Sequence, residues 1–150
     1  MLLISHRGNI EGRVPELENS PNYVSQAISL GYDVEVDLWV DNNLLYLGHD
    51  EPQYLVGDLW IAGFFYSLWI HCKNPEAITY MQENHPEANY FWHEKDTLTL
   101  TSKNYLWTYP GKQPVKNSIA VMPELYGDDI SECLGLCSDY VKKYKDENNL

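Results

Sequence analysis

Strand patterns that are each followed by a helix pattern recur along this chain of 150 residues, and they constrain its fold more than any other feature. An apolar run at 2–5 precedes a helix predicted over 18–31, and a second strand is predicted at 32–38. A third strand at 66–74 leads into a helix predicted over 74–85. Such repeated units are typical of a parallel sheet, and both an open doubly wound sheet and a closed barrel fit the pattern.

The predicted helices carry recognisable start and stop signals. Ser20 is the expected N-cap of the first helix, Pro21 fits its first position, and Gly31 can end it. Asn74 and Pro75 repeat the start signal for the next helix. Further predictions are a hairpin turn at 41–43, strands within 89–94, 104–109, 118–124 and 134–140, and a closing helix within 141–150. Between 94 and 135 there is almost no helical periodicity, so the crossovers there are expected to be short loops.

Composition limits the class of protein. A hydrophobic content of 44% and the absence of a composition shift predict a single domain over 1–150. The net charge of −12 argues against a nucleic-acid partner, because phosphate backbones are bound by clustered Lys and Arg. Three cysteines without a CxxC pair predict reduced thiols, and no segment is apolar enough for a signal peptide or a membrane span. We therefore expect a cytoplasmic protein.

The second predicted strand alternates between apolar and acidic side chains. The acidic side chains share one face and belong to Asp33, Glu35 and Asp37. One interpretation is an edge strand with a solvated outer face. The other is a cation site, because neighbouring carboxylates repel one another unless a positive charge keeps both ionised.

Titratable residues follow several predicted strands at the end where functional residues of parallel sheets gather. In chain order these residues are His6, Arg7, Glu35, Asp37, His49, Asp50, His71 and Lys73. A lone histidine is usually structural, but several of them converging with carboxylates indicate a catalytic site. His85 and His93 lack metal-ligand spacing and are interpreted as surface or loop residues, and Cys133 and Cys137 as buried thiols.

Four motifs in this part of the chain resemble those of the glycerophosphodiester phosphodiesterase family, in the same order and with roughly the same spacing. They are HRGN at 6–9, ENS at 18–20, GYDVEVDL at 31–38 and LGHD at 47–50. CSDY at 137–140 resembles the last strand of that family, and LWTY at 106–109 is weakly similar to a late strand. The match is strong over the first fifty residues and poor in the middle of the chain.

The resemblance implies a metal-dependent phosphodiesterase with a compact, trimmed TIM-type (β/α) barrel that has lost several helices. It implies that His6 and His49 act as the general acid and base, and that Glu35 and Asp37 bind a divalent cation. Arg7 and Lys73 would contact the phosphate of a small phosphodiester substrate. Mg²⁺ or Ca²⁺ is the expected cation, with Mn²⁺ as another candidate.

One departure from the family pattern concerns the metal site. Family members usually carry a third carboxylate on the third strand, where this chain has His71. His71 could be the third ligand and would shift the preference toward Mn²⁺ or Zn²⁺. Alternatively, Glu94 or Glu124 at a later strand end could supply the missing carboxylate.

The other departure is length, since a complete barrel of this type takes about 250 residues. A trimmed barrel would expose apolar surface, which a homodimer could cover. Two alternatives stay open: a weakly active or inactive relative that binds a phosphorylated or polyol ligand, and an enzyme that forms a cyclic phosphate.

Overall fold

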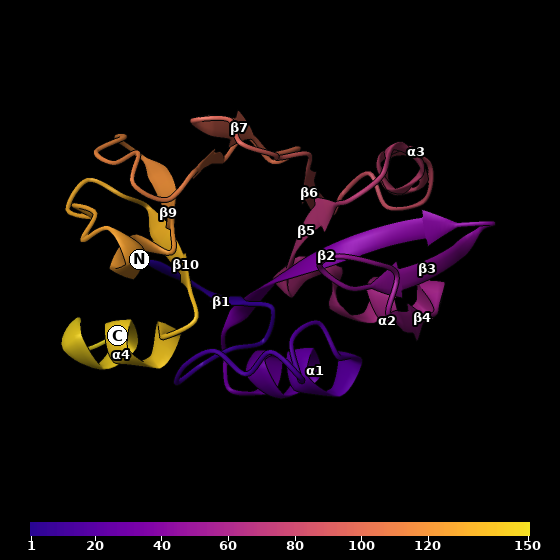
Figure 1. The fold of residues 1–150 in the computed structure, drawn as a ribbon, viewed down its shortest axis with the longest axis horizontal. Helices are drawn as coiled ribbons and strands as arrows, with labels where there is room; N and C mark the ends of the chain where they lie inside the picture. Colours follow the sequence, from indigo (N-terminus) through magenta and orange to yellow (C-terminus); the bar gives the residue numbers. More distant parts are fainter.

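The computed structural model describes residues 1–150 and consists of one curled sheet with helices outside the curl (Figure 1). The strands are β1 (Leu2–His6), β2 (Asp33–Asp41), β3 (Leu44–Leu47), β4 (Tyr54–Val56), β5 (Leu68–Cys72), β6 (Asn89–Phe91), β7 (Leu98–Leu100), β8 (Leu106–Thr108), β9 (Ser118–Val121) and β10 (Gly135–Ser138). The α-helices are α1 (Pro21–Ser29), α2 (Asp58–Phe64), α3 (Pro75–Asn84) and α4 (Val141–Glu147). Two 3₁₀ helices complete the fold, η1 (Phe65–Ser67) and η2 (Pro123–Leu125).

The two helix starts predicted from the sequence are confirmed. The Ser20 hydroxyl accepts a hydrogen bond from the Tyr23 N–H at the start of α1, and Pro21 is the first helical residue. The Asn74 side chain accepts in the same way from the Ala77 N–H at the start of α3. β4, α2 and β7 were not predicted.

Strand order places β2 near the middle of the sheet. β2 pairs in parallel with β5 on one edge, and on the other edge with β1 at its start and antiparallel β3 at its end. From β1 the sheet continues through β10, β9 and β8 to β7. The interpretation of β2 as a solvated edge strand is therefore wrong.

The predicted TIM-type barrel is also wrong. The sheet is mixed, because β3, β4 and β7 pair antiparallel with their neighbours, and no strand pairing joins β6 to β7. No α-helix lies between β6 and β10. The physical reason is that this half of the chain lacks amphipathic helical segments and forms strands of only three or four residues, so loops replace the outer helices.

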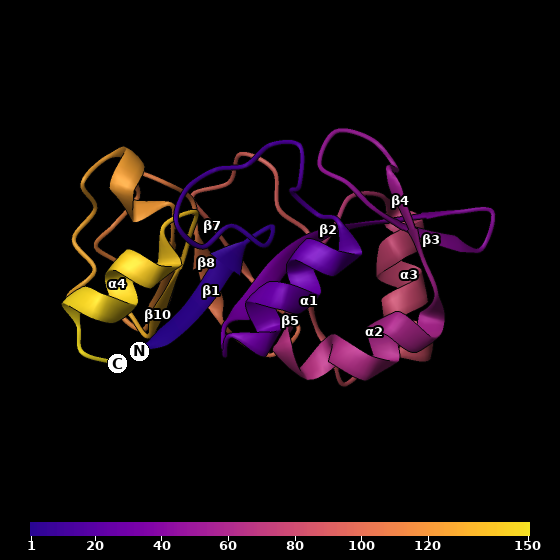
Figure 2. The same ribbon diagram turned by 90° about the horizontal axis from the view of Figure 1, so that it is seen from below.

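Apolar residues pack on both faces of the curled sheet. On the outer face, Val34, Val36 and Leu38 of β2 are fully buried in a cluster that includes residues of α1 and α3. On the inner face, an aromatic cluster includes Trp69 and Trp107. Figure 2 shows α4 and α1 on either side of β1. None of the helices is both long and apolar enough to cross a membrane.

Candidate functional site

Strand register brings four of the predicted site residues together. In the parallel ladders, His6 of β1 is level with Glu35 of β2, and Asp37 of β2 is level with His71 of β5. All four side chains lie on the inner face of the curled sheet, because the alternate residues of β2 pack outward. The sequence pattern therefore correctly predicted that these residues meet.

The two carboxylates of β2 are deeply buried and incompletely hydrogen-bonded. Glu35 is 3% exposed and Asp37 is fully buried, yet Glu35 Oε2 and Asp37 Oδ1 have no hydrogen-bond partner. Burial and the neighbouring Asp37 raise the pKa of Glu35 well above its usual range. Burial would also raise the pKa of Asp37, but the nearby imidazoles of His49 and His71 and the Arg7 charge outweigh it and hold that pKa well below its usual range.

His71 faces these carboxylates with a defined ring nitrogen. Its Nε2 lies 2.8 Å from the carbonyl oxygen of His93, which can only accept, so Nε2 carries a proton. Nδ1 lies 3.3 Å from Asp37 Oδ1 and 3.9 Å from Glu35 Oε1. In a neutral imidazole, Nδ1 directs its lone pair at two carboxylates, and the lone pair and the carboxylate oxygens repel one another. Either a proton on Nδ1 or a cation bound between Nδ1 and the carboxylate oxygens removes this repulsion.

These three side chains form a compact group of potential metal ligands. One ligand atom each from Glu35, Asp37 and His71 lies within 4.8 Å of the others. Two carboxylates and one imidazole suit a divalent cation, and the nitrogen donor favours Mn²⁺ or Zn²⁺ over the hard cations Mg²⁺ and Ca²⁺.

Two cations flank Asp37 and lie in the same cavity. The Arg7 Nε lies 3.0 Å from Asp37 Oδ2, and the Lys73 Nζ lies 3.7 Å from Asp37 Oδ1. Arg7 adopts a left-handed backbone conformation, with φ of 56°, and is followed by Gly8 at 95°. A Cβ on Gly8 would lie 2.6 Å from the Tyr23 ring, so this tight turn after β1 requires glycine.

The two candidate acid/base histidines have different hydrogen-bond partners. His6 Nδ1 lies 2.7 Å from a carboxylate oxygen of Asp139, so Nδ1 donates and Nε2 is directed toward Glu35 at 3.9 Å. The guanidinium of Arg7 donates to His49 Nδ1 at 2.6 Å, so His49 carries its proton on Nε2. His6 thus offers a free lone pair and His49 offers an N–H.

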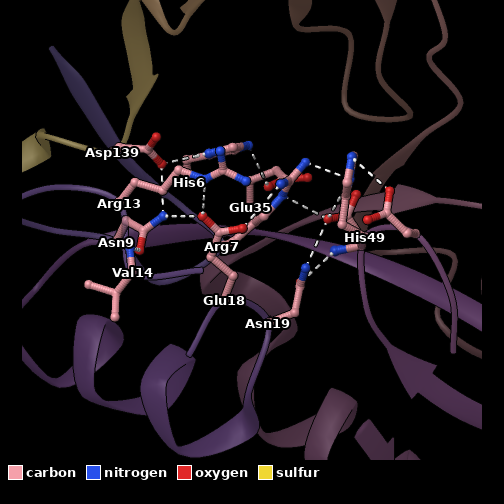
Figure 3. A network of polar contacts seen from close by, with 12 residues as sticks. His6, Arg7, Asn9, Arg13, Val14, Glu18, Asn19, Glu35, His49 and Asp139 are labelled. Atoms are coloured by element: carbon pink, nitrogen blue, oxygen red, sulfur yellow. Dashed lines mark hydrogen bonds and ion pairs between the residues drawn. The ribbon is translucent and has the colours of Figure 1, made fainter. Parts of the chain in front are cut away.

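A polar network connects the two histidines (Figure 3). Asn9 donates to Asp139 at 2.8 Å and to Glu18 at 3.0 Å, and Glu18 accepts from Arg7 at 3.3 Å. Asn19 donates to Asp37 at 2.9 Å and accepts from its backbone N–H at 3.0 Å. The network therefore runs without interruption from His6 to the carboxylates and to His49.

Sequence reasoning assigned no role to four members of this network, Asn9, Glu18, Asn19 and Asp139. The available signals were the motifs ENS and CSDY, in which Asp139 directly follows β10. Burial would raise the pKa of Asp139, but its hydrogen bonds with His6 and Asn9 outweigh burial and lower it. Asp139 is thus ionised and suited to orient His6.

The two alternative third carboxylates lie outside the compact ligand group. Glu94 is exposed at the rim of the cavity, and Glu124 is bound to the hydroxyls of Ser138 at 2.8 Å and Tyr144 at 3.4 Å. His93, predicted as a loop residue, follows β6 and lines the same cavity with its side chain 8% exposed. His85 binds Asp58 at 2.6 Å, outside the cavity.

No protein-family model matches this chain, and no curated protein matches it. The chemistry of the site is therefore the basis on which its function is inferred.

The candidate site opens into a cavity of about 500 Å³. Its polar lining includes His6, Arg7, His49, His71 and Lys73. A somewhat larger hollow of about 590 Å³ is lined by residues of α1, α4 and the loop after β1, including Tyr23, Tyr32 and Lys142, and contains no histidine. Only the cavity at the strand ends combines acid/base groups, cations and potential metal ligands.

Proposed function

We propose that this protein is a metal-dependent phosphodiesterase that hydrolyses a glycerophosphodiester or a related small phosphodiester. The observation that carries the proposal is the pair of buried carboxylate oxygens without a hydrogen bond, Glu35 Oε2 and Asp37 Oδ1, beside the Nδ1 atom of His71. Carboxylate oxygens without hydrogen bonds are costly inside a protein unless a cation binds them closely. The resemblance of the sequence motifs to the glycerophosphodiester phosphodiesterase family supports the same chemistry.

The residues of the site have complementary tasks in such a reaction. Glu35, Asp37 and His71 would hold the cation, and Arg7 and Lys73 would bind and orient the phosphate in a chain that is otherwise strongly acidic. A divalent cation bound there would stabilise the negative charge that develops on the phosphoryl oxygens.

His6 and His49 would carry out the proton transfers. His6 has a free Nε2 lone pair and an ionised carboxylate on Nδ1, which suits it to take a proton from the attacking water or hydroxyl. His49 gives up its Arg7 contact when that guanidinium turns to the phosphate, and its Nδ1 is then free to take up a proton for delivery from Nε2 to the leaving alcohol. Hydrolysis and cyclic-phosphate formation would use the same residues.

Hydrolysis of bis-p-nitrophenyl phosphate and glycerophosphocholine tests the proposal directly. The purified protein is incubated with Mn²⁺, Zn²⁺, Mg²⁺, Ca²⁺ or EDTA, and p-nitrophenolate or choline release is measured. We expect turnover that EDTA abolishes and that one of the cations restores. Equal turnover in EDTA would contradict the metal requirement, and no turnover with any cation would contradict the phosphodiesterase.

His71→Glu tests the choice of metal. A third carboxylate replaces the imidazole, so we expect the affinity for Mn²⁺ to fall by about 10- to 100-fold relative to the affinity for Mg²⁺ or Ca²⁺. Isothermal titration calorimetry measures both affinities, and His85→Gln is the matched control outside the cavity. An unchanged ratio of affinities would show that His71 is not a ligand.

A second candidate function is a relative that binds a phosphorylated or polyol ligand without turning it over. The Arg7 contact favours this alternative, because it occupies His49 Nδ1, the nitrogen that would have to take up a proton. Saturable calorimetric binding of glycerol phosphate without any hydrolysis would support it. Location in the cytoplasm and a homodimer stay predictions.

A further inference from the structure

Eight residues other than glycine have a left-handed backbone conformation. Six of them are asparagine, which tolerates this conformation. The other two are Arg7 and Met122. Both line the candidate site. Strained residues of this kind persist where the surrounding structure holds them in place, and they cluster at functional sites.

Met122 follows β9 and precedes Pro123. Its φ and ψ are 48° and 50°, although a following proline favours an extended conformation. Its N–H donates to the Cys137 carbonyl at 2.7 Å, and its carbonyl accepts from the Leu125 N–H at 3.1 Å. These two hydrogen bonds hold the unusual conformation.

The left-handed turn changes the face on which the Met122 side chain lies. Along β9, Ile119 and Val121 belong to the inner aromatic cluster, and Ala120 belongs to a cluster that includes α4. Continued strand alternation would place Met122 on the same side as Ala120. Instead it packs against the inner cluster and lines the cavity, so the strain serves to bring this side chain into the site.

Met122 belongs to an apolar half of that cavity. The charged and polar groups come from β1, β2, β5 and the segments after β3 and β6, whereas β8, β9 and the residues after them contribute Trp107, Tyr109, Pro110, Val121 and Met122. Figure 1 shows β9 and β5 on opposite sides of the curl. A phosphodiester bound to the cations of one half would direct an ester group toward the apolar half.

We propose that Met122, with Tyr109 and Pro110, is a specificity residue that selects phosphodiesters with an apolar alkyl or aryl ester group. The inference rests on the proposed phosphodiesterase activity and narrows its substrate class. Burial of a short alkyl chain against these three side chains favours such a diester, whereas a glycerol ester would exchange the hydration of its hydroxyls for mainly apolar contacts.

Dibutyl phosphate and diglyceryl phosphate provide the test, because each carries two identical ester groups. Phosphorus NMR measures kcat/KM for both with the activating metal. We expect wild type to prefer dibutyl phosphate by about 10-fold or more. Met122→Gln, which keeps the length but adds a polar end, should reduce this preference to below about 3-fold, and Met122→Leu should keep it. Leu125→Gln is the matched control, an exposed leucine in the same segment outside the cavity.

The outcomes separate this inference from the function on which it rests. Turnover of both diesters without preference, or an unchanged preference in Met122→Gln, would overturn the role of Met122 and leave the phosphodiesterase standing. Turnover of neither diester while bis-p-nitrophenyl phosphate is still hydrolysed would also overturn the role of Met122 alone. Absence of turnover of all these diesters would overturn both.

Melting temperatures test the backbone strain at Met122 separately from its role in specificity. Met122→Gly and Met122→Ala both remove the side chain, but only glycine accepts the left-handed conformation freely. We expect the glycine variant to melt about 2–4 °C above the alanine variant. A higher melting temperature for the alanine variant would contradict the strain.

Discussion

Replacement of His6 by alanine is expected to lower kcat/KM for a phosphodiester by about 10² to 10⁴-fold, with a small effect on folding. The ring is part-buried and its Nε2 has no hydrogen-bond partner, so the substitution removes the proposed general base. Steady-state hydrolysis of bis-p-nitrophenyl phosphate measures the loss. Circular dichroism and the melting temperature confirm that the variant folds.

Asp139→Asn tests whether the hydrogen bond between His6 Nδ1 and Asp139 keeps the lone pair of His6 on Nε2. An amide can donate to Nδ1, which would move the imidazole proton to Nε2 and remove the base. We therefore expect a fall of about 10²-fold in kcat/KM, and a changed pH–rate profile. His85→Gln is the matched control, because it disrupts a second histidine–aspartate pair at the same kind of distance but outside the cavity. Equal losses in both variants would indicate a general structural effect instead.

Glu35→Gln and Asp37→Asn are expected to change the stability of the metal-free protein in opposite directions. Glu35 is a buried carboxylate with an unpartnered oxygen, so the neutral amide should raise the free energy of unfolding by about 1–3 kcal/mol. Asp37 compensates the buried charge of Arg7, so its neutralisation should lower that free energy by about 3–5 kcal/mol. Both variants should lose metal binding.

The pH dependence of the free energy of unfolding is a second test of how Glu35 affects stability. The pKa of Glu35 is raised by folding, so the folded state binds more protons than the unfolded state above the usual value of 4.5. Its contribution to stability is therefore complete below 4.5 and is lost as pH rises toward the raised value. Urea unfolding in EDTA at several pH values should show this loss in wild type and not in Glu35→Gln.

Asp33→Asn is the matched control for both carboxylates. Asp33 lies on the same face of β2 but accepts from the Trp69 indole at 3.0 Å and is not in the metal-ligand group. Metal binding measured by calorimetry should be unchanged in this variant. Retained metal binding in Glu35→Gln and Asp37→Asn together would contradict the proposed metal site.

Local features of the sequence determined the starts of α1 and α3 and the inner face of β2. The N-caps Ser20 and Asn74 act within one turn, and strand alternation alone places Glu35 and Asp37 on one face. The meeting of these carboxylates with His6 and His71 was also predictable, because parallel neighbouring strands end at the same edge of a sheet.

Only the tertiary structure decided that the sheet stays open and which residues contact the side chains of the candidate site. The open, mixed sheet depends on whether distant, very short strands pair, and no local pattern encodes the missing pairing between β6 and β7. Asp139 lies 133 positions from the histidine that it contacts. Met122 lines the site because its N–H donates to the carbonyl of Cys137 on another strand, which helps to hold its left-handed turn. Propensity and periodicity report short-range preferences, whereas tautomers, unpartnered oxygens and strained turns arise from contacts between segments that are far apart in the chain.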